Sequence, residues 1–127
     1  MPRTEIIFYQ EKADKIPVLD WLNQLKRQDK KGFAKCVARI QQLQDFGHEL
    51  RRPASDFLRD GIWELRIRQG KIQYRILYFF DGQNIAILGH ALVKKGEAVS
   101  NADINKAIQR KEKFSQQPQN HTYEGEI

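Results

Sequence analysis

The sequence has little of what stabilises small secreted proteins or binds metal ions. Its 127 residues include one cysteine, Cys36, and three histidines that lie far apart in the chain. A single cysteine forms no intrachain disulfide and supports no multi-cysteine metal site, which is typical of a reducing compartment. The histidines lack the paired spacing of zinc sites, and no acidic loop resembles a calcium or magnesium site. We therefore expect no metal, and we expect Cys36 to be a buried, inert thiol.

Long hydrophobic runs and glycine-rich phosphate motifs are also missing. No stretch is long enough to span a bilayer, and the N-terminus lacks the apolar run of a signal peptide. No dinucleotide-binding or Walker-type motif is present. The sequence thus predicts a cytoplasmic protein with no membrane partner and no small-molecule cofactor. With 40% hydrophobic residues, it can still bury a single core.

Acidic residues are scarce in one segment. The formal net charge is +6, and residues 51–95 carry nine Lys or Arg against four Asp or Glu. Such a local excess permits nucleic acid, an acidic protein or an anionic membrane surface as partner.

Helix and strand signals predict an α+β fold. Pro17 suits a first helical turn, Asp29 suits an N-cap, Gly47 ends a helix, and Ser100 with Asp103 resembles a capping box. The predicted order begins with a strand over residues 4–10, two helices over 17–28 and 30–46, and a loop over 48–60. Three antiparallel strands follow over residues 62–68, 71–80 and 84–95, and a helix over 101–113 comes last. Gln69-Gly70 is the expected turn of the first hairpin. The two N-terminal helices form a hairpin that covers one face of the sheet and leaves the other partly open.

The end of the chain is polar. From Ser115 onward the sequence "SQQPQNHTYEGEI" contains Pro118 and Gly125 and no apolar periodicity. We therefore expect one domain over residues 1–114 and a disordered polar tail over residues 115–127.

Basic residues alternate along the predicted central strands. Alternation sends Arg66, Arg68 and Arg75 to the open face, because residues directly opposite each other across a hairpin lie on the same side of the sheet. Basic candidates at this face or its edges are Arg66, Arg68, Lys71, Arg75, His90, Lys94 and Lys95. Two simpler interpretations remain. Arg66 can pair with Glu64 or Asp81 while the other basic residues are solvated, and His90, in the apolar run "ILGHAL", can be a packed core histidine.

Such a cluster suits phosphate recognition. In RNA cleavage by internal transfer, a 2′-hydroxyl attacks the adjacent phosphorus and negative charge builds on the phosphoryl oxygens. Fixed guanidinium groups stabilise that charge without reorganising. The base would be a lysine whose pKa is lowered by neighbouring cations, or His90.

Two stretches, "LRDGIWELRIRQGKIQYRILYFF" and "ILGHALVKKGEAVSNADINKAIQRKEKF", resemble the RelE/HigB superfamily of bacterial toxins from type II toxin–antitoxin systems, and in particular its phage-derived HigB-like subgroup. The similarity extends to Phe114, and its most specific parts are residues 61–66, the Tyr74-Arg75 pair and Lys94-Lys95. It implies a RelE-like fold: a small antiparallel meander plus an N-terminal strand, two N-terminal helices on one face and a C-terminal helix.

The resemblance also implies a function: a metal-independent, ribosome-dependent mRNA endoribonuclease, held inactive by a cognate antitoxin that is often a helix-turn-helix protein. The expected catalytic residues are Arg68, Arg75, His90 and Lys94, and the expected RNA-binding residues are Arg66, Lys71 and Lys95. The resemblance implies the three arginines, Lys94 and Lys95, whereas His90 and Lys71 are candidates from the basic pattern alone. Arg75 matches the arginine expected to contact the scissile phosphate. Where some relatives stack a tyrosine on a base, this chain offers only Phe114 and, in its tail, Tyr123.

Three other functions are compatible with the same fold or with a basic surface. Gyrase-inhibiting toxins of the ParE type have the same architecture, so the fold alone does not assign RNA cleavage. A non-catalytic RNA- or ribosome-binding module and a structural partner of an acidic protein would also carry a basic surface.

Overall fold

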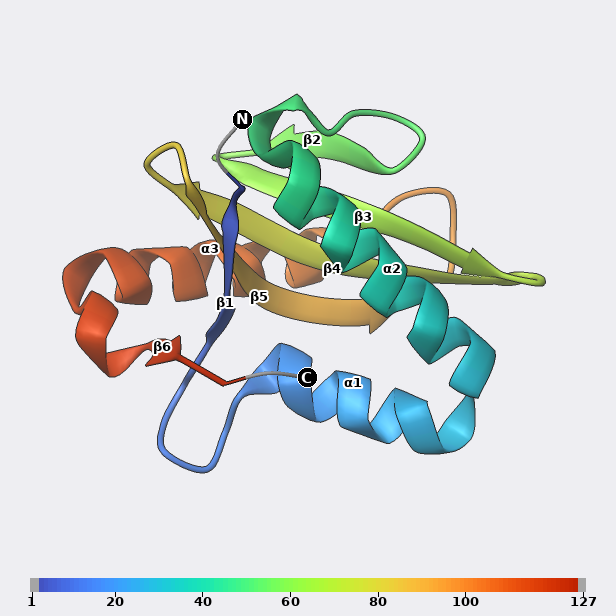
Figure 1. Cartoon of the computed structure of the whole chain (residues 1–127), viewed down its shortest axis with the longest axis horizontal. Helices are drawn as coiled ribbons and strands as arrows, with labels where there is room; N and C mark the ends of the chain where they lie inside the picture. The colour runs from blue at the N-terminus through green and yellow to red at the C-terminus, as the bar shows by residue number, and fades with distance from the viewer. Residues whose placement is uncertain (1–2, 126–127) are drawn as a thin grey trace.

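The computed structural model describes residues 3–125 as a six-stranded mixed sheet with helices on both faces (Figure 1). Its elements are β1 (Glu5–Tyr9), α1 (Pro17–Gln28), α2 (Lys30–Phe46), the 3-10 turn η1 (Gly47–Glu49), β2 (Ser55–Arg59), β3 (Ile62–Gln69), β4 (Ile72–Asp81), β5 (Ile85–Val93), α3 (Asn101–Gln116), the 3-10 turn η2 (Pro118–Asn120) and β6 (Thr122–Tyr123). The predicted α+β class and RelE-like arrangement are confirmed. Within residues 3–125, no helix is both long enough and apolar enough to cross a membrane.

The sheet has the strand order β2-β3-β4-β5-β1-β6. Strands β2 to β5 form an antiparallel meander, whereas β1 pairs with β5 in parallel, with Glu5 opposite Ile85 and Phe8 opposite Leu88. Strand β6 pairs antiparallel with the other edge of β1. The N-terminal strand therefore lies between two strands that come much later in the chain.

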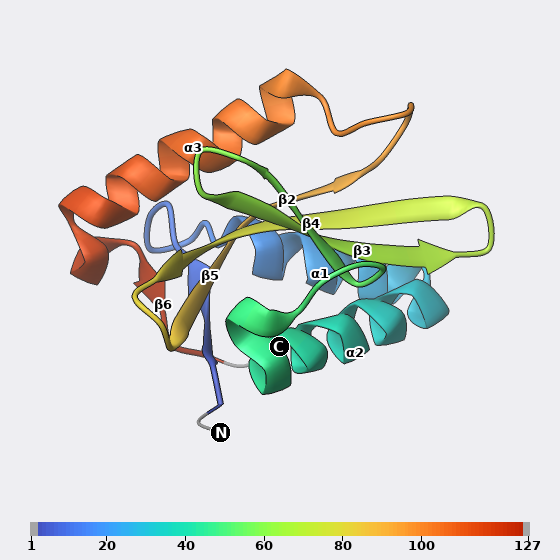
Figure 2. The same ribbon diagram turned by 90° about the horizontal axis from the view of Figure 1, so that it is seen from above.

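Each face of the sheet buries its own hydrophobic core (Figure 2). Leu22 of α1 and Ile40 of α2 belong to the core on one face, together with Leu65 and Ile76 of the sheet. On the other face, α3 packs over part of the sheet, and the tip of the β3–β4 hairpin extends beyond it (Figures 1 and 2). Each fully buried Leu or Ile contributes about 1.5–3 kcal/mol, so both cores hold their helices firmly. We term these two sides the α1/α2 face and the α3 face.

The helix ends follow the predicted signals. Pro17 occupies the first turn of α1, and the Asp29 carboxylate accepts the N–H of Gly32 at 2.9 Å at the start of α2. Gly47 ends α2 with a φ of 53°, and the Ser100 hydroxyl accepts the N–H of Asp103 at 3.1 Å. These caps satisfy main-chain groups that a helix end leaves unpaired.

The predicted loop over residues 48–60 is wrong in part, because it contains β2. This edge strand pairs with β3, with Asp56 opposite Glu64, and its register shifts between Phe57 and Arg59. A short strand with a register shift lacks clean alternation, which hid it from sequence reasoning. The hairpin turn lies one residue later than predicted: Gln69 is opposite Ile72, so Gly70, with a φ of 61°, and Lys71 form it.

The polar C-terminal segment is ordered where the structure describes it, in contrast to the expected disorder from Ser115. Ser115 is still part of α3, and β6 pairs with β1, with Tyr123 opposite Phe8. The His121 ring stacks on Tyr9 at 5.2 Å between centroids. The free edge of β1 holds this segment, and composition alone does not reveal such an edge. Residues 126–127 of the predicted tail lie outside the described residues.

Candidate functional site

A cluster of basic side chains lies on the α3 face of the β3–β4 hairpin. Arg66 is opposite Arg75 in the strand register, and Arg68 is opposite Gln73. The main-chain N–H of Lys94 donates to the carbonyl of Gln73 at 2.8 Å, which continues the pairing past the end of β5. Residues in matching positions share one side of the sheet. We term Arg66, Arg68, Arg75 and Lys94 the basic cluster.

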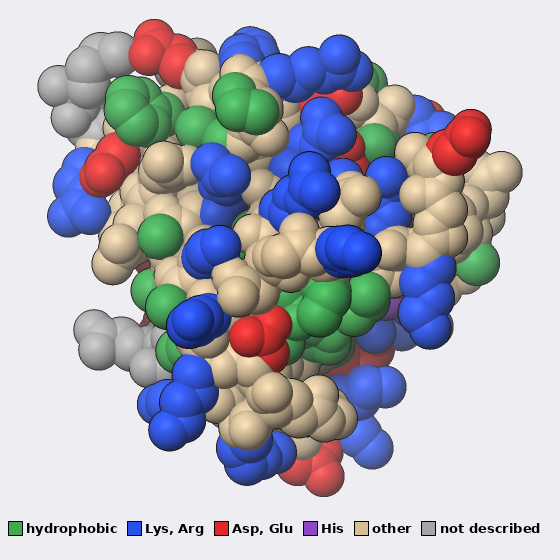
Figure 3. Space-filling model, turned by 90° about the vertical axis from the view of Figure 1, so that its right-hand side faces the viewer, with side chains coloured by type: hydrophobic (Ala, Val, Ile, Leu, Met, Phe, Trp, Pro, Cys, Tyr) green, Lys and Arg blue, Asp and Glu red, His purple; other side chains and the backbone are tan. Residues whose placement is uncertain are grey.

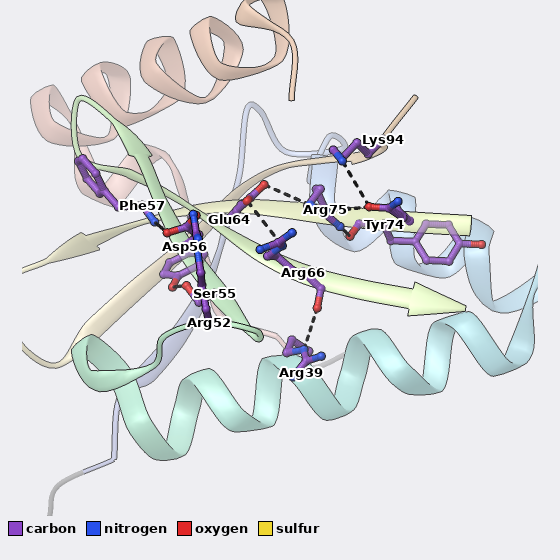
Figure 4. A network of polar contacts seen from close by, with 12 residues as sticks. Arg39, Arg52, Ser55, Asp56, Phe57, Glu64, Arg66, Tyr74, Arg75 and Lys94 are labelled. Carbon is purple, nitrogen blue, oxygen red and sulfur yellow. Dashed lines mark hydrogen bonds and ion pairs between the residues drawn. The ribbon is translucent and has the colours of Figure 1, made fainter. Parts of the chain in front are cut away.

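Arg75 is the buried centre of this cluster, with 3% of its surface exposed. Its Nε donates to Oε1 of Glu64 at 3.1 Å, and its terminal nitrogens donate to the Tyr74 carbonyl at 3.1 Å and to the Gln73 side chain at 2.9 Å (Figure 4). Burial lowers the pKa of the Arg75 guanidinium, while the charge of Glu64 opposes that shift. Three hydrogen bonds fix this guanidinium in one orientation.

Glu64 and Gln73 connect the remaining members. The second oxygen of Glu64 lies 3.9 Å from Nε of Arg66, and the Lys94 ammonium donates to the Gln73 side chain at 3.4 Å (Figure 4). From the opposite face, Arg39 of α2 donates to the Arg66 carbonyl at 2.9 Å and supports β3. The buried Glu64 carboxylate is thus shared by two arginines, Arg66 and Arg75, and the network remains positive.

The exposed members surround this buried centre. The Arg66 side chain is 35% exposed, and Arg68 is exposed with its Nε donating to the Gly70 carbonyl at 3.0 Å. Lys71 in the hairpin turn and Lys95 after β5 are also exposed. Figure 3 views this end of the molecule and shows Lys and Arg side chains gathered on it around a hydrophobic area. Several N–H groups are therefore available to an anion from solvent.

His90 is predicted to belong with the basic residues, but it contacts α3 instead. Its Nε2 lies 2.7 Å from a carboxylate oxygen of Asp103, and Arg110 donates to its Nδ1 at 3.3 Å. Since Nδ1 accepts, the ring proton is assigned to Nε2, which donates to Asp103. Burial lowers the pKa of His90, which favours the neutral ring. Both ring nitrogens are occupied, and His90 helps to hold α3 against β5.

The two aromatic residues considered for base stacking lie away from the basic cluster. Phe114 is 5% exposed and packs edge-to-face on Phe79, with centroids 5.8 Å apart. Tyr123 is in β6, at the far edge of the sheet, and packs on Phe8 at 6.5 Å. Neither ring is placed to stack on a base bound at the cluster.

Other reactive groups are few in the part of the chain that is described. Among residues 3–125, no three His, Cys, Asp or Glu side chains are grouped so that they could hold a metal ion. Cys36 is fully buried, and burial raises the pKa of its thiol to about 12. The predicted inert cysteine is confirmed, because a thiol with this pKa stays protonated and unreactive near neutral pH.

Sequence reasoning considered Glu64 only as an ion-pair partner on a solvated face, and it missed Asp103 and Arg110, which contact His90. Glu64 has the same strand parity as Arg66 and Arg68, so a carboxylate inside a basic stretch was the signal for a buried ion pair. For Asp103 and Arg110 no such signal exists, because helical spacing does not show which residues of α3 meet β5.

A search of curated proteins finds no match to this chain. The family described as Phage derived protein Gp49-like (DUF891) matches residues 20–112, well over half of the chain. The matched segment runs from α1 into α3 and contains every member of the basic cluster. The chain therefore belongs to the phage-derived Gp49-like family, which is a RelE/HigB-like toxin family.

Proposed function

We propose that this protein is the toxin of a toxin–antitoxin pair, and that it stops translation by cutting messenger RNA on the ribosome without a metal ion. The observation that carries the proposal is the basic cluster, in which a hydrogen-bonded guanidinium lies among exposed cations on a part of the sheet that α3 leaves open. The family already implies an antitoxin as partner. A helix-turn-helix antitoxin, the ribosome and the message are the partners that we propose.

The proposed reaction is an internal transfer within the RNA. The 2′-oxygen attacks the adjacent phosphorus, the bond from phosphorus to the 5′-oxygen breaks, and a 2′,3′-cyclic phosphate and a 5′-hydroxyl result. A base removes the 2′-hydroxyl proton, and an acid protonates the leaving 5′-oxygen. Charge that develops on the non-bridging oxygens is stabilised by donors that are already oriented.

The positions of the cationic side chains suggest their roles. Arg66 and Arg68 are accessible and would bind phosphates of the message, with Lys71 and Lys95 at the margins. A guanidinium has five N–H donors, and Arg75 uses three of them within the protein. Arg75 is also only 3% exposed, so its predicted contact with the scissile phosphate requires the RNA to displace side chains that shield the guanidinium from solvent.

Lys94 is the better placed candidate for the general base. It is half-buried within the basic cluster, and its ammonium lies 3.4 Å from the Gln73 side chain. The alternative, His90, would first have to give up a hydrogen bond to Asp103 or Arg110. Arg68 stays a prediction as acid or as a positioning group.

The ribosome supplies what these residues lack. Lysine and arginine are weak acid–base catalysts near pH 7, so proton transfer contributes little unless the reacting atoms are already aligned. A message held in a near-attack geometry can gain about 7–11 kcal/mol from positioning. Free RNA should therefore be cut slowly or not at all.

Arg66→Ala and Arg68→Ala provide the sharpest test. Both side chains are accessible, so their removal should abolish growth arrest and new message ends, mapped by primer extension, while the protein stays folded. Arg75→Ala is less informative, because it leaves Glu64 buried without its closest partner. Arg59→Ala, which removes an exposed pair with Asp60, is the matched control. Undiminished arrest by both cluster variants at equal expression would contradict the proposal.

Messages and DNA from the same cultures show whether the target of the toxin is RNA or gyrase. The proposal predicts shortened translated messages and unchanged DNA supercoiling. Trapped gyrase–DNA complexes without new message ends would instead favour a gyrase-inhibiting toxin, and ribosome binding without cleavage would favour a non-catalytic module.

A further inference from the structure

A hydrophobic hollow of about 410 Å³ lies beside the basic cluster, between α1 and the adjoining ends of β4 and β5. Its lining residues are Trp21, Gln24, Leu25, Gln28, Asp29, Ile72, Tyr74 and Val93. Ile72 and Val93 are 43% and 42% exposed, which places them among the most exposed large hydrophobic residues of residues 3–125. Together with the hollow, these two exposed aliphatic side chains form a contiguous apolar surface of the kind that interaction sites use.

The hollow is built rigidly. The Trp21 ring packs edge-to-face on Tyr74 at 5.5 Å, and the Tyr74 hydroxyl donates to Asp29 at 2.6 Å. The other oxygen of Asp29 caps α2 through the N–H of Gly32. These hydrogen bonds lower the pKa of Asp29, so its carboxylate is ionised and already engaged. A partner would therefore meet a preformed apolar surface with little free negative charge.

Cations surround this hollow. The segments that adjoin it, namely the last turn of α1, the first turn of α2, the hairpin turn and the end of β5, carry Lys26, Arg27, Lys30, Lys31, Lys71, Lys94 and Lys95. In Figure 3, Lys and Arg side chains frame the hydrophobic area at this end of the molecule. A partner that fits must combine an apolar anchor with negative charge around it.

The lining favours a polypeptide over RNA. Sequence-tolerant RNA binding relies on aromatic faces on which bases stack. Here Tyr74 is 4% exposed and Trp21 is half-buried with its ring edge-to-face on Tyr74, whereas the aliphatic side chains of Ile72 and Val93 are the most exposed apolar groups of the lining. Aliphatic side chains contact a leucine or isoleucine better than they contact a base.

We propose that this hollow is the docking site for an acidic segment of the antitoxin, which inserts an apolar side chain between Trp21, Ile72 and Val93 and directs its carboxylates at the surrounding lysines and arginines. The inhibitory consequence of docking rests on the proposed function, because it requires the basic cluster to be the RNA site. Ile72 and Val93 directly precede Gln73 and Lys94, whose side chains belong to the cluster network on the other face. Carboxylates of the docked segment would therefore reach Lys94 and Lys71 and compete with RNA phosphates.

The test measures binding without RNA. The probe is the protein encoded by the gene beside this one, and the reporter is Trp21 fluorescence in the Trp63→Phe variant, since the chain has only two tryptophans. Binding should shift Trp21 emission to the blue and protect it from a soluble quencher. Ile72→Glu and Ile72→Lys should both raise Kd at least about tenfold, as expected for the loss of an anchor. Val93→Glu is the second variant if Ile72→Glu does not fold.

The matched control is Phe57→Glu, which introduces the same charge at a 48% exposed residue on the far edge strand β2. Its Kd should equal that of the parent protein. Unchanged Kd in both Ile72 variants, or failure of the probe to bind the parent protein, would overturn the docking site. A site that works through charge alone would behave differently, because the Kd of the probe would fall in Ile72→Lys and rise in Ile72→Glu, and that pattern would also overturn the proposal. Loss of RNA cleavage as a function would leave the binding result unaffected.

Discussion

The α3 face contains two buried arginines in two different settings. Arg110 is 7% exposed beneath its own helix, where it donates to the Gly89 carbonyl at 2.8 Å and lies over the Tyr9 ring. Among residues 3–125 its Nε finds no hydrogen-bond partner, and a carboxylate oxygen of Glu11 is 3.9 Å away. Arg75 is 3% exposed beyond α3, and each of its three nitrogens donates a hydrogen bond.

The difference shows what each arginine does. Arg110 holds a helix on the sheet, and an imperfect set of hydrogen bonds is sufficient because packing of Phe114 and Ile104 supplies most of the attachment. Arg75 lies beyond α3 on this face, and hydrogen bonds from all three of its nitrogens fix the side chains around it. The uncovered half therefore keeps its shape without packing from above, as a preorganised binding surface requires.

The largest effect should come from Glu64→Ala. This change leaves the buried Arg75 guanidinium without its carboxylate, which costs about 3–5 kcal/mol when a buried ion pair loses one partner. Urea unfolding monitored by circular dichroism measures the free energy of unfolding. Asp56→Ala is the control, because its ion pair with Arg52 is at the surface and screened by solvent, so its loss should change the free energy of unfolding little. Equal losses in the two variants would contradict the central role given to Glu64.

A smaller loss is expected for Arg110→Ala. The change removes charged hydrogen bonds to the Gly89 carbonyl and to Nδ1 of His90, and such bonds contribute about 1.5–3 kcal/mol. Because the damage is confined to the contact between α3 and β5, hydrogen exchange should accelerate there and remain slow in the β3–β4 hairpin. Uniform acceleration through both regions would show that the two arginines are not independent.

The pH dependence of stability should identify His90. Burial lowers its pKa in the folded protein below the usual 6.5, so between these two values the unfolded chain binds more protons than the folded one. Stability is therefore complete above pH 6.5 and falls as the pH drops below it. Asp103, whose pKa is lowered by hydrogen bonds from His90 and Ser100 against the effect of burial, stays ionised in this range. Arg110 and Lys106 are the cations whose charges disfavour protonation of His90.

The check compares urea midpoints at pH 7 and pH 5 for the parent protein and His90→Gln. The parent protein should lose more stability than the variant over this interval. The opposite ranking would mean that protonated His90 gains more from Asp103 than it loses by burial.

The smallest change in stability is expected for Arg66→Ala. The side chain is partly exposed and its nearest carboxylate oxygen is 3.9 Å away, so the free energy of unfolding should change by less than about 0.5 kcal/mol. Its effect should appear in RNA binding instead, where loss of one phosphate contact lowers the salt dependence by about one unit of slope. A stability loss as large as that of Glu64→Ala, with unchanged binding, would assign Arg66 to structure.

The sequence predicts which side of the sheet a side chain occupies better than it predicts how deeply that side chain is buried. Alternation correctly placed Arg66, Arg68 and Arg75 on one side, and Asp29, Gly47 and Ser100 correctly marked helix ends. Alternation along a strand does not show where a helix distant in sequence packs on the sheet. It could therefore not show that α3 covers His90 while the Arg68 side chain stays exposed.

The same limit explains the burial of Arg75 and the two missed strands. Arg75 is buried because it hydrogen-bonds to Glu64 on β3 and to Gln73, two residues before it on β4. These side chains come together only when β3 and β4 pair in the observed register. Strands β2 and β6 have weak local signals and form because a neighbouring strand offers free main-chain groups.

The placement of β1 sets the order in which the sheet can close. Its two neighbours, β5 and β6, begin with Ile85 and Thr122, so β1 stays unpaired while most of the chain is being synthesised. Closing such long loops costs conformational entropy before the pairings with β1 contribute any stability. The β3–β4 hairpin costs less, because its loop has only two turn residues. The hairpin that carries three of the four cluster residues can therefore form early, whereas β1 joins the sheet late and β6 can only follow it.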